Sequence, residues 1–375
     1  MKILIDMSFV RPYELTMSIP IYGLRLLQAI PESRVKDVHL LIDGNLEHFF
    51  HEHFPQFGTT SVSVKGIFRK ANWRVKDMLF DIVHRWKIFT TGFDIVLTLN
   101  ELTSYATFRT RKKKVSVIHD LKDLSIKSGK KQVQSRQFYQ RLIDRADIVV
   151  AISEYTRQNI LNNYDVDAGK IRVIHNSIKM TAASKCPEGF SADAPYILYV
   201  NTLLEYKNPL TLLKAFKSVM DKVEERLVLV GRDTEYWHDV LRPYIKQNGL
   251  ENRVTRMQNL TDEEIKYLYE HASLFVSSSR HEGFGYTPLE AAICCCPVIC
   301  TKCEALPETT MMLLNYYEPA EDDSELANRI VEVLATPRNM TELKSISNRF
   351  IQEYSPERQV SQFFELMDNL GTETK

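Results

Sequence analysis

Residues 275–308 decide the fold, and they begin Phe275-Val-Ser-Ser-Ser-Arg-His-Glu-Gly-Phe-Gly-Tyr-Thr-Pro-Leu-Glu-Ala-Ala292. The apolar start followed by serines predicts a buried strand that runs into a loop. The two glycines of that loop let backbone N–H groups approach a ligand, since glycine has no side chain and tolerates positive φ. Pro288 suits the first turn of a helix over residues 289–295. The positive end of that helix would face the loop, so the pattern predicts a site for a phosphate or another anion.

Two acids bracket this anion site. Glu282 directly precedes the glycines, and Glu290 follows eight residues later, inside the predicted helix. Acids at the mouth of an anion site are suited to accept hydrogen bonds from sugar hydroxyls. The alternative is that Glu282 caps the loop and that Glu290 complements the helix dipole. Spacing alone leaves both interpretations open.

The order of these residues resembles a known family. Glu282-Gly-Phe-Gly285 followed by Pro288-Leu-Glu-Ala is similar to the Glu-x7-Glu motif of retaining glycosyltransferases of family 4, which have the GT-B fold. Cys296-Pro-Val and Ala305-Leu-Pro-Glu resemble the next strand and loop of that family. The resemblance implies that Glu290 holds the nucleotide ribose and that Glu282 contacts the donor sugar. It also implies that the backbone around Gly283, Phe284 and Gly285 meets the sugar or the phosphates.

The chain of 375 residues is long enough for two domains. A strand at 2–6 and a helix at 22–30 resemble the opening of a doubly wound α/β domain. Residues 179–194 lose their periodicity and predict a linker. We therefore expect an acceptor-binding domain over 1–178, a nucleotide-sugar-binding domain over 195–353, and a C-terminal helix over 354–375 that crosses back. In the GT-B fold these are two Rossmann-like domains that face each other across a cleft.

Composition excludes some partners and places the protein. Lys plus Arg and Asp plus Glu both number 48, so no nucleic-acid partner is expected. There is no apolar run of about 18 residues and no signal-peptide pattern, which predicts a cytoplasmic protein. Six cysteines predict reduced thiols, and the spacing of Cys300 and Cys303 lacks the second pair that a zinc site needs. No Asp-x-Asp ends a strand, so we expect neither a metal nor another cofactor.

The second half contains further candidates for donor binding. Lys207 precedes a predicted helix, so its ammonium and the helix end could meet one diphosphate. Lys-Asn-Pro here resembles the phosphate-binding lysine of the family, but Thr202 stands where the family has arginine. Thr202 cannot supply a bidentate, permanently charged donor. The family also places the turn at Gly231 and Arg232 near the nucleotide, which implies close approach and a phosphate or base contact.

The first half contains one polar pair at a strand end. His119 and Asp120 follow the predicted strand 115–118, at the carboxyl edge where ligands bind in open α/β sheets. Such a histidine can donate to a sugar hydroxyl, and the neighbouring carboxylate would fix its tautomer. The alternative is a loop histidine that meets no substrate. The resemblance implies that His119 approaches the donor sugar, and we expect Asp120 to contact the acceptor. The expected loop over 17–23 has one glycine, whereas the family has several, so fewer bare N–H groups reach the phosphates.

Residues 67–89 combine bases with aromatic side chains. They contain six bases, two acids and five aromatic residues, which suits a helix at an anionic membrane surface. The alternative is that the aromatic residues belong to the core and the bases to a solvated face. The basic run 109–114 is interpreted as a solvated turn or as a second lipid contact.

The hypothesis is therefore a glycosyltransferase with His119, Glu282 and Lys207 as catalytic residues. It would move a hexose from a nucleoside-diphosphate sugar to a glycan or lipid-linked acceptor with retention of configuration, in bacterial cell-surface polysaccharide synthesis. It would act in the cytoplasm or at the inner face of the membrane. The alternatives are a nucleotide-sugar epimerase of the same fold and a non-catalytic protein that binds nucleotide sugars.

Overall fold

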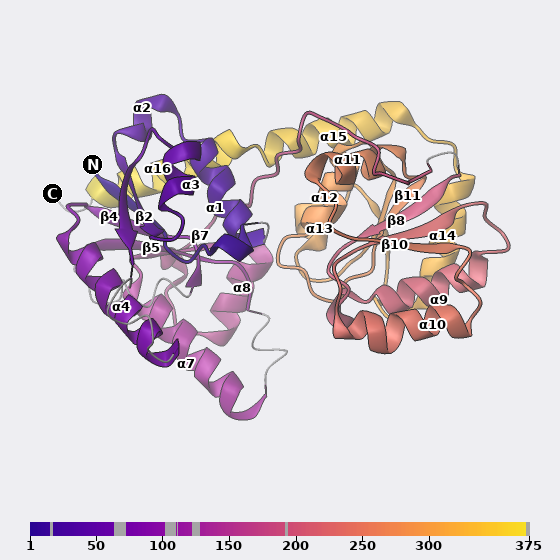
Figure 1. The fold of residues 1–375 in the computed structure, drawn as a ribbon, viewed down its shortest axis with the longest axis horizontal. Helices are drawn as coiled ribbons and strands as arrows, with labels where there is room; N and C mark the ends of the chain where they lie inside the picture. The colour runs from indigo at the N-terminus through magenta and orange to yellow at the C-terminus, as the bar shows by residue number, and fades with distance from the viewer. Residues whose placement is uncertain are drawn as a thin grey trace. The chain divides into compact units, whose positions relative to one another are not determined.

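The computed structural model describes residues 1–15, 18–63, 73–101, 110, 112–121, 128–191 and 194–372. It contains two compact units, Met1–Ser177 with Pro356–Lys375 and Ile178–Ser355, each built on one parallel sheet (Figure 1). Parts of the predicted segments lie outside the described residues: 17, 67–72, 109, 111, 192–193 and 373–375.

The first unit has a seven-stranded sheet in the order β3-β2-β1-β4-β5-β6-β7. Its strands are β1 Ile3–Met7, β2 Val38–Asp43, β3 Gly58–Val62, β4 Ile95–Thr98, β5 Lys113–Ile118, β6 Ile148–Ala151 and β7 Ile171–Val173. Its α-helices are α1 Ser18–Gln28, α2 Glu32–Val35, α3 Glu47–His53, α4 Trp73–Thr90, α7 Gly129–Arg145, α8 Glu154–Asn163 and α16 Pro356–Thr372. The central strands are apolar and β-branched because both faces of a parallel sheet are covered by helices.

The second unit has a six-stranded parallel sheet in the order β10-β9-β8-β11-β12-β13. Its strands are β8 Tyr196–Val200, β9 Arg226–Val230, β10 Val254–Met257, β11 Leu274–Ser277, β12 Val298–Thr301 and β13 Asn315–Tyr317. Its α-helices are α9 Pro209–Val219, α10 Arg242–Gln247, α11 Asp262–His271, α12 Tyr286–Ile293, α13 Leu306–Thr309, α14 Asp323–Ala335 and α15 Met340–Glu353. The strand order reverses between β8 and β11, so the loops that follow these two strands leave the sheet where ligands bind in this class of fold.

One prediction about the first unit is wrong. We expected residues 17–23 to form a loop, but α1 begins at Ser18, and residues 18–23 are helical. Pro20 is tolerated because it lies in the first turn, where its missing N–H leaves no hydrogen bond unmade. Gly23 lets α1 pack closely on β1, since a Cβ at this position would lie 2.8 Å from Met7 Cε. The glycine therefore serves helix packing in this structure.

Side-chain caps begin two of the helices, and the prediction of reduced cysteines is confirmed. The Ser153 side chain accepts a hydrogen bond from the Thr156 N–H at the start of α8. Thr261 and Glu264 form a capping box at the start of α11, which satisfies two backbone donors. All six cysteines are free thiols.

Candidate functional site

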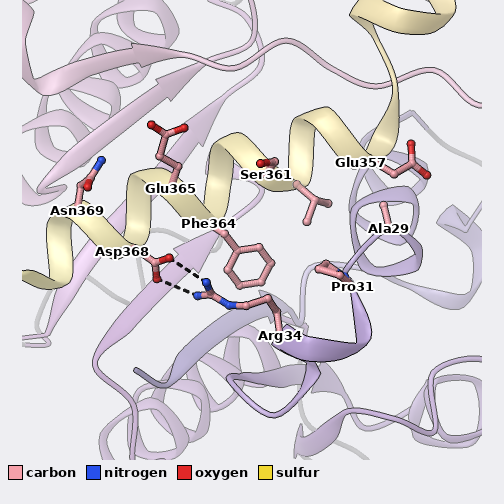
Figure 2. A pocket seen from close by; sticks show the side chains of 10 residues that line it. Ala29, Pro31, Arg34, Glu357, Ser361, Phe364, Glu365, Asp368 and Asn369 are labelled. Carbon is pink, nitrogen blue, oxygen red and sulfur yellow. Dashed lines mark hydrogen bonds and ion pairs between the residues drawn. The ribbon is translucent and has the colours of Figure 1, made fainter.

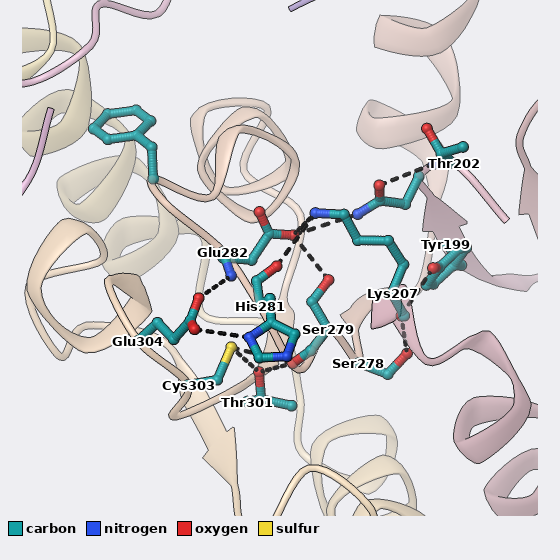
Figure 3. A network of polar contacts seen from close by, with 12 residues as sticks. Tyr199, Thr202, Lys207, Ser278, Ser279, His281, Glu282, Thr301, Cys303 and Glu304 are labelled. Atoms are coloured by element: carbon teal, nitrogen blue, oxygen red, sulfur yellow. Dashed lines mark hydrogen bonds and ion pairs between the residues drawn. The ribbon is translucent and has the colours of Figure 1, made fainter. Parts of the chain in front are cut away.

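The loops after β8 and β11 bring two predicted site residues together. Lys207 Nζ lies 2.7 Å from Glu282 Oε1, and the two side chains are only 13% and 11% exposed (Figure 3). Lys207 ends a short 3₁₀ turn, and Asn208 then reverses the chain with φ 55° so that Pro209 can begin α9. The sequence predicted both residues at the site but did not predict that they pair with each other.

Further donors hold the Glu282 carboxylate in place. Its Oε1 also accepts from Ser279 Oγ at 2.8 Å and from Asn201 Nδ2 at 3.5 Å. Lys207 Nζ also donates to the His281 carbonyl at 3.5 Å. A largely buried carboxylate needs several donors because desolvation penalises its charge. The pair is therefore neutral as a unit, and Glu282 is fixed in one orientation.

Glu304, which sequence reasoning missed, braces this loop from the β12 side. Its Oε2 accepts the Glu282 backbone N–H at 2.7 Å, and its Oε1 lies 2.8 Å from His281 Nδ1 (Figure 3). Glu304 has φ 48°, a conformation that costs a residue with a side chain roughly 1 kcal/mol. The sequence offered no signal for it, since an acid in a loop is ordinarily a surface residue.

The helix after the glycine loop is α12, and it begins at Tyr286, directly after Gly285. Gly285 caps it with φ 89°, and a Cβ there would lie 2.3 Å from Leu306 Cδ2. Phe284 is buried, with its ring centroid 5.3 Å from that of Tyr354. The Phe284 side chain therefore belongs to the core, and only its backbone is suited to meet a ligand. Gly283 precedes it and is half-buried.

Glu290 lies in the second turn of α12. The buried Tyr269 hydroxyl donates to Glu290 Oε2 at 3.3 Å, which orients the carboxylate. Burial, with a smaller contribution from the Glu290 charge, raises the pKa of Tyr269 well above its usual range. Tyr269 thus stays a hydrogen-bond donor at any physiological pH. A ribose-binding role for Glu290 remains a prediction.

The turn after β9 contains the predicted Gly231 and Arg232, and a second arginine, Arg256, contacts it from β10. Gly231 is required there, because a Cβ would lie 2.4 Å from the Asn201 carbonyl oxygen. Arg232 is exposed, whereas Arg256 Nη2 donates to the Gly231 carbonyl at 3.2 Å. Arg256 Nη1 also pairs with Asp233 at 2.8 Å. The backbone N–H of Thr202, on the neighbouring loop, donates to Asn201 Oδ1 at 2.9 Å.

His119 directly follows β5 in the first unit and is 8% exposed. Its Nε2 lies 2.8 Å from the Leu99 carbonyl oxygen, which can only accept, so Nε2 carries the proton. The Leu99 carbonyl thus fixes the tautomer, and not the Asp120 carboxylate as we expected. The His119 backbone N–H donates to Glu101 Oε1 at 2.9 Å, and burial raises the pKa of Glu101. Asp120 itself is half-buried.

A second polar cluster at the end of β1 is structural. His84 Nε2 lies 2.8 Å from Asp6 Oδ2 and 3.2 Å from Ser8 Oγ, and all three side chains are buried. Both partners meet the same ring nitrogen, whereas a nucleophile relay needs one partner on each nitrogen. The cluster therefore fastens α4 to β1, and no pattern in the sequence indicates it.

A cavity of about 550 Å³ in the first unit lies between α16 and the α1–α2 segment (Figure 2). Arg34 forms two hydrogen bonds of 2.8 Å with Asp368, and its guanidinium lies 4.2 Å from the Phe364 ring centroid. The hydrogen bond from Arg34 lowers the pKa of Asp368. No predicted site residue lines this cavity, and its contacts account for the docking of α16 on the unit.

The described part of the chain lacks two other features, a cluster of metal ligands and a membrane-spanning helix. No group of three His, Cys, Asp or Glu side chains there is arranged to hold a metal ion. No helix among those residues is both long enough and apolar enough to cross a membrane.

Two family models match the chain, and each covers one half. "Glycosyltransferase Family 4" matches residues 24–181, and "Glycosyl transferases group 1" matches residues 182–350.

Curated relatives are distant. O-antigen chain mannosyltransferase B of Escherichia coli is 25% identical over an alignment of 229 residues, which covers 55% of this chain and 58% of that protein. O-antigen chain mannosyltransferase RfbU of Salmonella typhimurium is 24% identical over 306 residues, which are 81% of this chain and 83% of that protein. The chain thus spans little more than half the length of the first of these relatives.

Solved structures share the whole fold. Sucrose-phosphate synthase from Thermosynechococcus elongatus has a TM-score of 0.77 at 20% identity, with 98% of both chains covered. Anabaena HepE in complex with UDP-glucose has a TM-score of 0.76 at 18% identity, with 98% of this chain and 100% of that chain covered. Because the two family models adjoin and the neighbours share both sheets, the chain belongs to the group 1 glycosyltransferases of family 4, which have the GT-B fold.

Proposed function

We propose that this protein transfers a hexose from a nucleoside-diphosphate sugar to a glycan or lipid-linked acceptor, with retention of configuration, in cell-surface polysaccharide synthesis. The observation that carries the proposal is the Lys207–Glu282 pair, with its 2.7 Å contact. The pair lies in the loops that leave the sheet at the β8–β11 reversal, and the Glu282 loop leads directly into the start of α12.

Each member of the pair has a chemical task in such a reaction. The Lys207 ammonium has three N–H donors, so it can hold Glu282 and still donate to a diphosphate. Together with the positive end of α12, it would stabilise the charge that develops on the leaving diphosphate. Among the residues that the structure describes, no hydrogen bond is made to Glu282 Oε2. That oxygen is suited to accept from a hydroxyl of the donor sugar.

The remaining predicted residues have separate tasks in this proposal. Glu290 would hold the ribose hydroxyls from α12, with its carboxylate oriented by Tyr269. His119 would approach the donor sugar and Asp120 the acceptor, but their roles rest on the family resemblance. Gly231 would admit the nucleotide, and the exposed Arg232 would contact it after a movement of its side chain.

The names of the relatives suggest which donor to test first. Two of them are named O-antigen mannosyltransferases, so we propose mannose as the first candidate sugar and a surface polysaccharide as the product. HepE was crystallised with UDP-glucose, so uridine and guanosine donors both belong in the panel.

The experiment measures sugar transfer from a panel of nucleotide sugars by wild type, Lys207→Ala and Glu290→Ala. Removing an electrostatic group from the site should lower transfer by about 100-fold or more. Lys302→Ala is the matched control, because it removes a lysine from a surface pair with Glu318 in the same unit. Full activity in both site variants would refute the proposal. Sugar conversion without an acceptor would indicate an epimerase, and donor binding without turnover would indicate a non-catalytic binding protein.

A further inference from the structure

Helix α4 exposes an apolar stripe. Ile82, Trp86 and Phe89 are 52%, 58% and 87% exposed, and their spacing of four and three residues puts them on one face of the helix. On the opposite side Ile88 is buried in the core, and Phe80 packs against the same cluster. Of the aromatic side chains that the structure describes in α4, Phe80 thus belongs to the core, and Trp86 and Phe89 are exposed.

Such a stripe differs from ordinary surface hydrophobicity. Single exposed apolar residues are common and require no explanation. Here three large side chains lie in a row, and Lys87 Nζ lies 5.3 Å from the Trp86 ring centroid. A tryptophan with a lysine beside it suits a boundary between water and lipid, where the ring is half-buried and the ammonium stays hydrated.

A strongly basic helix covers the same face of the sheet. Ile88 of α4 packs against Val96, while α7 packs against Ile118 and Val149. In the sheet Thr98 is aligned with Ser116, and Ser116 with Val149. Side chains alternate along a strand, so Val96 and Ile118, each two residues from an aligned position, lie on the same face as Val149. The helices α4 and α7 therefore lie on the same side of the sheet (Figure 1).

The exposed charged side chains of α7 are mostly cationic. The helix carries one acid, Asp144, against five exposed bases: Lys130, Lys131, Arg136, Arg141 and Arg145. A local excess of this size attracts anionic lipid headgroups, because each base near such a surface contributes about 1 kcal/mol. The whole chain has no net formal charge, so its attraction to anionic lipids would come from this local excess of bases.

The size of the stripe argues against a protein partner. Fully exposed aromatic and aliphatic side chains present at most roughly 200 Å² each, and these three are partly covered. A stable protein interface needs about 800 Å² on each partner. Insertion of a few side chains into a headgroup layer has no such minimum area, and surface charge adds to it.

We propose that this face is a docking surface for an anionic lipid bilayer. Ile82, Trp86 and Phe89 enter the headgroup region, while Lys87 and the bases of α7 meet the anionic lipids. The surface deepens the proposed function, since it would hold the enzyme at a membrane that carries a lipid-linked acceptor. It rests on exposure and charge, so it can fail while the proposed transfer reaction stands.

The test is co-sedimentation of the full chain with vesicles of phosphatidylcholine, with and without phosphatidylglycerol. Wild type should bind the anionic vesicles, bind neutral ones weakly, and dissociate as salt screens the charges. The double variant Trp86→Ser with Phe89→Ser should bind at least about tenfold more weakly, because it lacks the two aromatic rings that would insert into the bilayer. The matched control is Met340→Ser with Ile351→Ser on α15, which removes two exposed apolar side chains from the second unit. It should bind like wild type.

Two further measurements keep the result decisive. Tryptophan emission should shift to shorter wavelength on addition of anionic vesicles, and Trp86→Phe should remove the shift. All variants should keep the wild-type unfolding temperature, since the altered side chains are exposed. Equal binding by the Trp86–Phe89 double variant, or equal binding to neutral vesicles, would overturn the proposal. A wild-type dimer that the same double variant converts to a monomer would also overturn it, because the stripe would then be a subunit interface.

Discussion

Replacement of Glu282 by glutamine tests the logic of the site more sharply than deletion of either partner. Glutamine keeps the shape and one acceptor oxygen, so Lys207 Nζ, now 2.7 Å from Glu282 Oε1, keeps its partner and its position. Ser279 likewise keeps its acceptor. The substitution therefore removes the negative charge with little change in geometry.

The expected effect on nucleotide binding follows from the distances. A phosphate oxygen bound to Lys207 Nζ at about 2.8 Å would lie roughly 5 Å from the carboxylate. At an effective dielectric constant of about 20, two unit charges at this separation repel by about 3 kcal/mol. Charge delocalisation over the diphosphate and screening by Lys207 should leave about half of this. We expect nucleoside diphosphate to bind Glu282→Gln about tenfold more tightly than wild type.

The assay is isothermal titration calorimetry with UDP and GDP, combined with sugar transfer from the best donor. Transfer should fall by about 100-fold while nucleotide affinity rises, because the sugar loses its charged acceptor. Glu332→Gln on α14 changes the net charge equally and breaks only a surface pair with Arg329, so it serves as the control. Unchanged or weaker nucleotide binding by Glu282→Gln would refute the idea that this carboxylate neutralises the phosphate site.

Two further predictions concern one turn and one buried acid. Gly231→Ala should cost about 1–3 kcal/mol of stability and weaken nucleotide binding, because its Cβ would lie 2.4 Å from the Asn201 carbonyl oxygen. A melting temperature no lower than that of Gly92→Ala, where a Cβ meets nothing within 4 Å, would contradict this. Burial raises the pKa of Glu101 in the folded protein, so folding favours the protonated side chain. The stability that this proton contributes is complete below the pKa of the unfolded state and is lost as pH rises through the pKa of the folded state. Glu101→Gln keeps an acceptor for the His119 N–H and should gain melting temperature relative to wild type as the pH rises above the ordinary glutamate pKa of about 4.3. A difference in melting temperature that stays constant with pH would count against this prediction.

The sequence predicted the fold class because its signals are local and repeated. Short apolar strands that end in glycine or serine, such as the one before Gly231, alternate with helices of clear periodicity. Side-chain caps such as those at Ser153 and Thr261 are local in the same way, because they join residues only three apart. The start of α1 was misplaced, since Pro20 looks like a loop residue and only packing shows that it lies in a first helical turn.

The contacts of the site were much less predictable. Lys207 and Glu282 were both singled out, yet their pairing joins positions 75 residues apart. Arg256 was not singled out, yet this residue of β10 donates to the Gly231 carbonyl on the neighbouring strand end. Periodicity and capping patterns contain no information about such contacts, which depend on strand order.

Backbone conformation explains why the site is so well fixed. Three residues in the loops around the Lys207–Glu282 pair have positive φ: Asn208 at 55°, Gly285 at 89° and Glu304 at 48°. Glycine commonly adopts positive φ and asparagine tolerates it, so Gly285 and Asn208 are ordinary choices, whereas a glutamate with positive φ is unexpected. Its conformational cost is offset by two contacts, to the Glu282 N–H and to His281 Nδ1. Strain retained in this way is typical of functional sites. The brace from Glu304 holds the backbone of Glu282 while Lys207 and Ser279 hold its carboxylate, so both ends of the residue are positioned before any donor arrives.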